Sequence, residues 1–173
     1  MTYWQEERLV IRTMEPEDGP ELIRGEQAQG YHTTEAKFHM RLRDQAEGRS
    51  IALTAVHGGL AVGYIHVYRQ AADGPFAGAG IPEIVDFGVL EKYRCRGIGS
   101  RLMDTAEGIA RELAPRVCLG VGLHQGYGAA QRLYVKRGYI PDGSGVWYRE
   151  EICQPYGPCT NDDSLVLYLS KQL

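Results

Sequence analysis

Residues 94–99 combine two arginines with two glycines, in the order Arg-Cys-Arg-Gly-Ile-Gly. Glycine lets a charged ligand approach the main chain because it has no Cβ, and arginine supplies fixed positive charge. Strand-forming residues precede this segment over 84–90, and an apolar stripe with helical spacing follows it over 98–113. The first amides of such a helix have no intrahelical partner and carry partial positive charge. The segment therefore predicts a phosphate-binding turn, with an ordinary strand-to-helix turn as the alternative.

The spacing of this segment excludes two other phosphate-binding motifs. A P-loop requires Gly-x-x-x-x-Gly-Lys-Ser/Thr, and the chain has no such run. The dinucleotide fingerprint requires Gly-x-Gly-x-x-Gly, but Leu102 stands where the third glycine would be. What remains is Arg-x-x-Gly-x-Gly. This pattern resembles the pyrophosphate-binding loop of the GNAT superfamily of N-acetyltransferases, which reads Gln/Arg-x-x-Gly-x-Gly/Ala.

A second segment carries the same resemblance. Residues 130–139 read Ala-Gln-Arg-Leu-Tyr-Val-Lys-Arg-Gly-Tyr and are similar to the family's Ala-x-x-Leu-Tyr-x-x-x-Gly-Phe/Tyr. Two motifs in this order are more specific than either alone. The resemblance covers essentially the whole chain and implies one N-acetyltransferase domain over residues 1–173. It implies an α/β (α+β) GNAT fold, with a single mixed sheet of about six to seven strands flanked by about four helices.

The resemblance implies transfer of an acetyl group from acetyl-CoA to a primary amine, by direct attack in a ternary complex. It places the pyrophosphate on the turn and pairs the pantetheine arm with the strand before the turn. The implied acetyl-CoA contacts are Phe87, Val89, Arg94, Arg96, Gly97, Ile98, Gly99 and Ser100. Tyr127 joins this set at a position where many members carry an asparagine that contacts the CoA arm.

Two side chains match catalytic positions of the family. Tyr134 matches the tyrosine that gives a proton to the departing thiolate, although a buried core aromatic would suit the same position. Glu83 corresponds to the catalytic glutamate of the histone acetyltransferase branch, and a carboxylate there could accept the proton of the amine. The alternative for Glu83 is a solvated acid at the start of a strand.

Four other side chains on predicted strands are weaker candidates. Asp86 shares the strand of Glu83 and points to the opposite face if the strand alternates simply. The others are Tyr64, His66 and His124. A lone histidine on a strand is more often a hydrogen-bonded structural group than a catalytic one. Cys95 lies between two arginines, but the family mechanism needs no cysteine nucleophile.

The elements that must position these residues follow in a regular order. We predict a strand, two helices, three strands, a helix, a strand, a helix and two strands. Two glycines at 58–59 predict a hairpin between two of the strands. Gly25 and Gly30 predict that the first helix is weak or broken. The strand predicted over 116–124 has one nearly bare face, which would let a helix or ligand approach its backbone.

Composition excludes several classes of function. The net charge of −3 gives no attraction toward nucleic acid or an acidic membrane surface. No apolar run approaches the roughly 20 residues that span a bilayer. The four cysteines have no Cys-x-x-Cys spacing, so we expect no metal site and a cytoplasmic location. Cys153 and Cys159 could still meet across a loop.

The acceptor is the least determined part of the prediction. The family builds its acceptor cleft from the early helices and the late hairpin loop, which are residues 16–48 and 150–163 here. Both segments are rich in Asp and Glu, which favours a small cationic amine, with ordinary solvated charge as the alternative. A protein N-terminal or lysine acetyltransferase acting on a peptide, and a non-catalytic acyl-CoA-binding regulatory module, remain alternatives. A homodimer is compatible with each of them.

Overall fold

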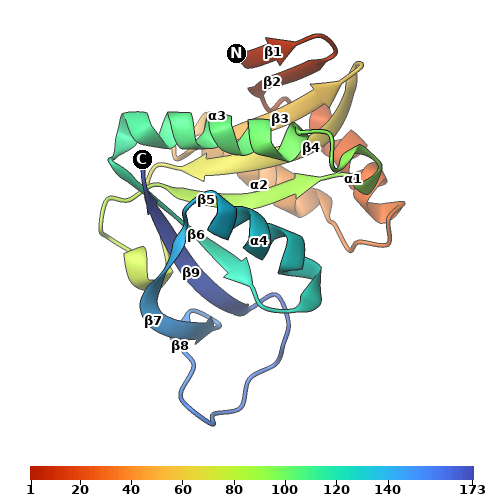
Figure 1. Cartoon of the computed structure of the whole chain (residues 1–173). Helices are drawn as coiled ribbons and strands as arrows, with labels where there is room; N and C mark the ends of the chain where they lie inside the picture. The colour runs from red at the N-terminus through yellow and green to blue at the C-terminus, as the bar shows by residue number, and fades with distance from the viewer. The chain divides into compact units, whose positions relative to one another are not determined.

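The computed structural model describes all 173 residues and contains four α-helices and nine strands (Figure 1). The mixed α/β class is as predicted, but the number of strands is nine rather than six to seven. The chain divides into two compact units. The first comprises Met1–Tyr68 and Ile84–Ile109, and the second comprises Arg69–Glu83 and Ala110–Leu173. The expectation of a single domain stays a prediction.

The first unit contains five strands in the order in which they occur along the chain. They are β1 (Thr2–Glu6), β2 (Leu9–Thr13), β3 (Ser50–His57), β4 (Leu60–Tyr68) and β5 (Glu83–Val89). The first four pair antiparallel with their neighbours. The sequence pattern does not predict β1, because the residues of this edge strand are mostly polar and none of them is fully buried.

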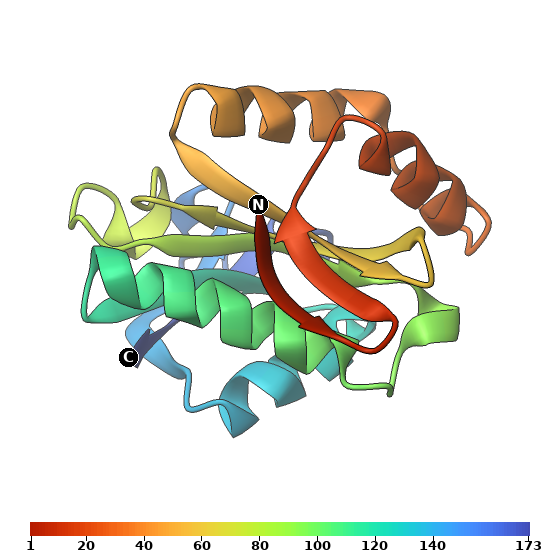
Figure 2. The ribbon, with the colours of Figure 1, turned by 90° about the horizontal axis from the view of Figure 1, so that it is seen from above.

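Helices cover both faces of this sheet, as Figure 2 shows. On one face lie α1 (Asp18–Gln27) and α2 (Glu35–Ala46), and on the other lies α3 (Ile98–Leu113). The predicted break at Gly25 is wrong. A Cβ at this position would come within 2.5 Å of Leu90 Cδ1, so the glycine lets α1 pack closely on Leu90 without interrupting the helix.

Local signals account for two other features of the first unit. The glycines at 58–59 both have positive φ, at +61° and +88°, which confirms the predicted hairpin turn. The apolar stripe of α3 is buried, as its spacing predicted. Its buried members are Ile98, Leu102, Ala106 and Ile109.

The second unit has four strands in the order β6-β9-β7-β8. They are β6 (Arg116–Gly122), β7 (Ile140–Tyr148), β8 (Glu151–Ile152) and β9 (Leu165–Gln172), and their pairings are antiparallel. One helix, α4 (Gly128–Lys136), belongs to this unit. Three short 3₁₀ segments complete the chain: η1 (Gly74–Phe76), η2 (Glu91–Tyr93) and η3 (Gln125–Tyr127).

Two strands of the second unit differ from expectation. The sequence pattern predicts a strand only over 146–149, at the end of β7. The earlier part of β7 is hidden because Gly143 and Gly145 have positive φ and its register on β9 shifts between Pro141 and Val146. The bare face of β6 is filled by neighbouring side chains. A Cβ at Gly122, for example, would come within 2.3 Å of the Tyr127 ring.

No helix in the chain has the length and apolarity that a membrane span requires.

Candidate active site

The turn at residues 94–99 has the backbone geometry of an anion site. Cys95 and Gly97 both adopt left-handed conformations, with φ of +59° and +80°. The first hydrogen bond of α3 runs from the Arg101 amide to the Gly97 carbonyl at 3.0 Å. The amides of residues 98–100 therefore precede the helical ladder and lie at its positive end. Left-handed residues within such a turn shape a concave backbone surface that suits phosphate oxygens.

Gly99 brings this turn against β5. A Cβ at Gly99 would lie 3.1 Å from Phe87 Cζ and 3.7 Å from Val89 Cγ2. A larger side chain would separate the first turn of α3 from the strand. The first unit thus brings together the turn and the two β5 residues that the family resemblance assigns to the pantetheine arm.

Arg94 is fixed on the end of β5. Its Nε donates to the Val89 carbonyl at 3.0 Å and its Nη2 donates to Tyr31 Oη at 3.2 Å. It also pairs with Glu91 at 3.4 Å. About half of the Arg94 side chain stays exposed, so its charge can face a ligand on the turn.

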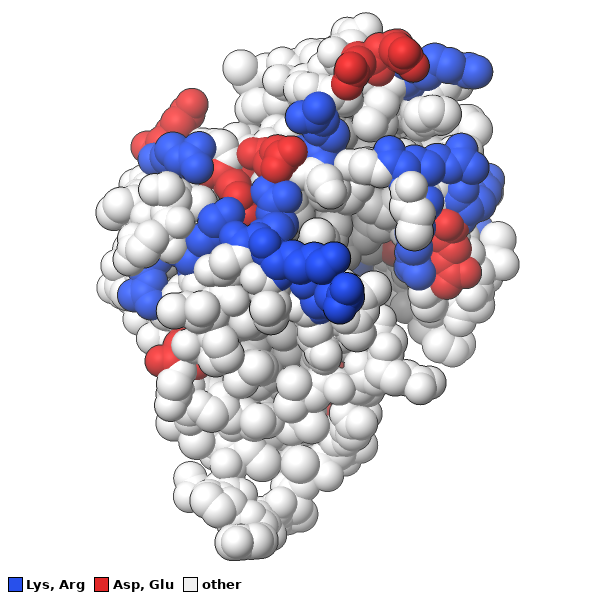
Figure 3. All heavy atoms as spheres, viewed as in Figure 1, with Lys and Arg blue, Asp and Glu red and all other residues white.

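Positive charge surrounds the turn. Its exposed basic residues are Lys92, Arg94, Arg96 and Arg101. Figure 3 shows Lys and Arg side chains gathered in patches on this face of the molecule, with acidic side chains among them. The loop of residues 150–163 contains no lysine or arginine.

Asp86 lies on β5 in a left-handed conformation, with φ of +51°, which a non-glycine residue adopts at a cost. Its carboxylate accepts a hydrogen bond from Arg41 Nε at 2.6 Å and lies 3.5 Å from Lys37 Nζ. Burial alone would raise the pKa of Asp86, but the two cations of α2 outweigh burial and lower it. This weaker sequence candidate is therefore an ion-paired anchor and a poor proton acceptor.

The same network continues along α2. Arg41 donates to the Tyr68 phenol, which in turn donates to Asp44. Asp44 also accepts a hydrogen bond from Arg49 at 2.5 Å. The hydrogen bond from Tyr68 lowers the pKa of Asp44, against the opposing effect of burial. These contacts tie α2 to the end of β4 and to the middle of β5.

Tyr64 makes further polar contacts with α1 and α2, and Lys37 connects them to Asp86. Its phenol donates to Glu26 Oε1 at 2.5 Å, and Thr33 donates to the other oxygen of the same carboxylate. Lys37 Nζ lies 3.3 Å from Tyr64 Oη. Tyr64 and Glu26 are only 5% and 8% exposed. From the sequence, Tyr64 is a weak candidate for the proton acceptor and Glu26 is only one of several acids in the early helices. Their pairing could not be predicted, because the two residues meet only in the folded chain.

His66 is fully buried, and its ring nitrogens have no hydrogen-bond partner. Burial is the main cause that lowers its pKa, to about 3. The ring is therefore neutral at neutral pH, and a base this weak does not suit a proton acceptor for an ammonium group.

The remaining sequence candidates belong to the second unit. Tyr134 on α4 is 6% exposed, and its ring centroid lies 5.8 Å from that of Tyr139. Burial raises the pKa of Tyr134, so its phenol keeps its proton at neutral pH. Glu83 is half-buried near Cys118 and Tyr168. Burial, helped by the Glu83 charge, raises the pKa of each of these two groups to about 12.

Tyr127 and His124 both contact Asp163, at one end of the loop of residues 150–163. The phenol of Tyr127 donates to Asp163 Oδ1 at 2.9 Å, and His124 Nε2 lies 2.9 Å from the same oxygen. His124 Nδ1 accepts a hydrogen bond from the Gly126 amide, so Nε2 carries the proton. The structure therefore engages both side chains in positioning residues 150–163.

Three of the acids that sequence analysis assigned to the acceptor cleft have structural partners. Asp18 pairs with Arg12 at 2.7 Å, and Glu21 accepts from the Ala61 amide at 2.7 Å. Glu26 accepts from Tyr64 and Thr33. The early helices are thus less acidic toward a ligand than their composition indicates.

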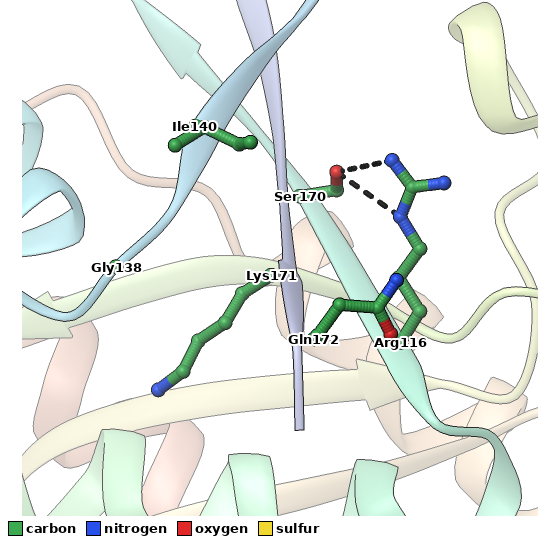
Figure 4. Close-up of a pocket in the computed structure, with 6 residues that line it drawn as sticks. All are labelled: Arg116, Gly138, Ile140, Ser170, Lys171 and Gln172. Carbon is green, nitrogen blue, oxygen red and sulfur yellow. Dashed lines mark hydrogen bonds between the residues drawn. The ribbon is translucent and has the colours of Figure 1, made fainter.

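A pocket of about 340 Å³ lies in the second unit. Arg116 crosses one side of it and donates to Ser170 Oγ at 2.7 and 3.2 Å (Figure 4). The residues around it are Arg116, Gly138, Ile140, Ser170, Lys171 and Gln172. None of them was a candidate in the sequence.

The cysteines form no disulfide in this structure, and all four are free. Cys153 and Cys159 nevertheless lie near each other across the loop. No group of His, Cys, Asp and Glu side chains is arranged to hold a metal ion.

Comparison with solved structures identifies the architecture. Ard1 from Thermoplasma volcanium is 22% identical, with a TM-score of 0.69 over 96% of this chain and 98% of that chain. The putative acetyltransferase yncA from Salmonella typhimurium, solved with its cofactor acetyl-CoA, is 15% identical, with a TM-score of 0.67 over 96% and 94%. Ribosomal-protein-alanine N-acetyltransferase from Brucella melitensis is 20% identical, with a TM-score of 0.67 over 94% and 99%.

At these identities the likeness concerns the fold, and it confirms the GNAT fold that the sequence predicted. No curated protein matches the sequence. A model of the acetyltransferase (GNAT) family matches residues 12–139, which include the turn, β5 and the Tyr134 segment. The chain therefore belongs to the GNAT family of acetyltransferases.

Proposed function

We propose that this protein is an N-acetyltransferase that moves an acetyl group from acetyl-CoA to a primary amine. The observation that carries the proposal is the turn at residues 94–99, whose left-handed residues and helix-end amides lie against β5. Such a turn suits a diphosphate. Membership of the GNAT family supports acetyl-CoA as the ligand that brings the diphosphate.

The turn and β5 have distinct roles in this proposal. The amides of residues 96–100 bind the diphosphate, and Arg94 and Arg96 neutralise its charge. Backbone groups of Phe87 and Val89 pair with the pantetheine arm. The arrangement aligns the thioester for direct attack, and alignment can contribute several kcal/mol to lowering the barrier.

Proton transfer is assigned to side chains. The attacking amine must lose a proton before it becomes nucleophilic, and the departing thiolate must gain one. Tyr134, whose phenol is protonated at neutral pH, supplies the proton to the thiolate. The family resemblance suggests Glu83 as a candidate for the proton acceptor, and the choice of acceptor is open to test by mutation.

The acceptor that we propose is a small cationic amine. The loop of residues 150–163 supports this choice, because it carries four acids and no basic residue. Its acids are Glu150, Glu151, Asp162 and Asp163. The early helices add less support, since Asp18, Glu21 and Glu26 are already engaged within the fold.

A protein N-terminus or a lysine side chain is the second candidate acceptor. The observation that favours it is the name of the Brucella melitensis neighbour, a ribosomal-protein-alanine N-acetyltransferase. A non-catalytic acyl-CoA-binding module is the third candidate function. In such a module the phenol of Tyr134 would transfer no proton.

An acetyl-CoA turnover screen distinguishes these functions. The panel contains polyamines, aminoglycosides, simple alkyl amines and peptides with free N-termini, and the readout is free thiol. We expect turnover with at least one small cationic amine. Turnover with peptides alone would favour the second candidate, and binding of acetyl-CoA without any turnover would favour the regulatory module. No binding at millimolar acetyl-CoA would refute the proposal.

A further inference from the structure

Tyr64 and Glu26 form a buried hydrogen-bonded pair between β4 and α1, with 2.5 Å between Tyr64 Oη and Glu26 Oε1. Thr33 donates to the second carboxylate oxygen and holds its orientation. We propose that this pair, rather than Glu83, takes the proton from the acceptor amine. The inference rests on the proposed function, because it requires the thioester to lie on β5.

The position of the phenol supports this role. Gly88 lies between Phe87 and Val89, the two residues assigned to the pantetheine arm. A Cβ on Gly88 would come within 3.0 Å of Tyr64 Cζ and 3.1 Å of Tyr64 Oη. The phenol thus lies directly against the main chain of β5. Any side chain at residue 88 would displace it.

Lys37 shows that a primary ammonium fits at this place. Its Nζ lies 3.3 Å from Tyr64 Oη, 3.5 Å from Asp86 Oδ1 and 5.0 Å from the Tyr64 ring centroid. An acceptor amine is also a primary ammonium at neutral pH. The acceptor nitrogen takes the position beside the phenol, while Lys37, which is 30% exposed, keeps its pairing with Asp86.

The other groups that face the phenol are less suited to accept a proton. Asp86 on β5 has a lowered pKa because Lys37 and Arg41 outweigh its burial. His66, whose ring centroid lies 5.9 Å from that of Tyr64 on the same strand, is neutral and fully buried. Glu26 of α1 is a carboxylate that accepts a hydrogen bond from the phenol directly, and Lys37 of α2 donates to the phenol.

The proton of the acceptor ammonium passes through the phenol of Tyr64 to the carboxylate of Glu26. The ammonium gives one proton to Tyr64 Oη while the phenol gives its own proton to Glu26. The free amine then forms the C–N bond to the acetyl carbon, and the C–S bond breaks. The attacking nitrogen then loses its second proton to solvent, while Tyr134 gives a proton to the leaving thiolate and regains one from solvent. The products are the amide, the thiol of CoA and a protonated Glu26, which returns its proton to solvent, so one proton is released in total.

The test compares two kinds of acceptor at a pH of about 8. An alkyl amine is mostly protonated there and needs a proton acceptor, whereas a weakly basic amine such as hydroxylamine does not. Tyr64→Phe keeps the ring, which packs edge-on against Phe38 at 5.4 Å, and removes only the hydroxyl. We expect kcat/KM to fall about 100-fold with the alkyl amine and by less than about threefold with the weakly basic amine.

Three further variants control this test. Glu26→Gln should show the same selective loss. Glu83→Gln should not. Tyr68→Phe is the matched control, because it removes the hydroxyl of another tyrosine on β4. That hydroxyl bonds Arg41 and Asp44 and does not bond Glu26. Thermal unfolding checks that each variant folds, and calorimetry checks that each binds acetyl-CoA.

The outcomes separate this inference from the proposed function. Absence of wild-type turnover would overturn both. Wild-type turnover with no loss in Tyr64→Phe and Glu26→Gln, or with equal losses for both amines, would overturn only the inference. A selective loss in Glu83→Gln alone would return the role to Glu83.

Discussion

Gly97 combines a left-handed backbone, with φ of +80°, and open space around the position of its missing Cβ. The conformation explains the glycine, because other residues adopt it at a cost of about 1 kcal/mol. The open space matters for function, because a ligand can reach the amides beside it. Tyr134 is a contrasting residue, since its surroundings are closed and its phenol keeps its proton.

Gly97→Glu should abolish acetyl-CoA binding, because a carboxylate would enter the phosphate-binding turn and repel the diphosphate. Gly59→Glu is the matched control. Gly59 also has positive φ, at +88°, and open space around it, but it lies in the β3–β4 hairpin. Both variants carry similar backbone strain, and only the first should lose binding in a calorimetric titration. Retained binding in Gly97→Glu would refute the assignment of the turn.

Tyr134→Phe should lower turnover at least about tenfold with little change in acetyl-CoA affinity, because only the proton donor is removed. Tyr139→Phe removes a phenol from the neighbouring buried ring and should leave turnover within about twofold of wild type. Steady-state kinetics with free thiol as the readout measures both. If Tyr134→Phe turns over as fast as wild type, Tyr134 has no part in the mechanism.

At the scale of elements, glycines set how closely helices approach strands. Gly99 brings the first turn of α3 against Phe87, and Gly25 brings α1 against Leu90. Helix propensity alone predicts neither contact, because it counts each glycine only as destabilising the helix. The contacts matter for the site because α1 carries Glu26 and α3 carries the first amides of the turn.

Gly25→Val should destabilise the protein by about 1–3 kcal/mol, because the new side chain has no room beside Leu90. Gly108→Val, in the middle of α3, is the matched control, since a Cβ at Gly108 meets nothing within 4 Å. We expect its free energy of unfolding to change by less than about 0.5 kcal/mol. Urea unfolding followed by circular dichroism measures both changes. Equal destabilisation of the two variants would contradict the packing argument.

At the scale of the whole molecule, buried ionisable groups link stability to pH. His66 is buried and neutral in the folded protein, with a pKa lowered to about 3, whereas the unfolded chain protonates it near 6.5. Above pH 6.5 the histidine is neutral in both the folded and the unfolded state, so its contribution to the free energy of unfolding is at its full value. This contribution decreases as the pH falls toward 3, because only the unfolded chain gains the proton.

We expect the free energy of unfolding to fall by up to about 1.4 kcal/mol per pH unit below pH 6.5 because of this one group. The lowered pKa values of Asp44 and Asp86 act in the same direction, but only below their ordinary value of 3.8. Urea unfolding between pH 4 and 6.5 therefore isolates the histidine. His66→Gln should flatten the slope, whereas His32→Gln, at an exposed position, should keep it. An unchanged slope in His66→Gln would contradict the assignment.

The sequence by itself determined the features that depend on neighbouring residues. Glycine conformation, helical spacing and a strand-forming run are local properties, and they located the hairpin at 58–59, the turn at 94–99 and helix α3. The same local rules failed at β1 and β7, where a polar edge strand and two left-handed glycines hide the strand pattern.

Only the tertiary structure decided which polar side chains meet. Tyr64 and Glu26 are 38 residues apart in sequence, and Arg41 and Asp86 are 45 apart. Their contacts exist because α1 and α2 pack on the sheet that carries Tyr64 and Asp86. Local rules cannot assign such partners, since the pairing depends on how helices and strands pack and not on the order of residues.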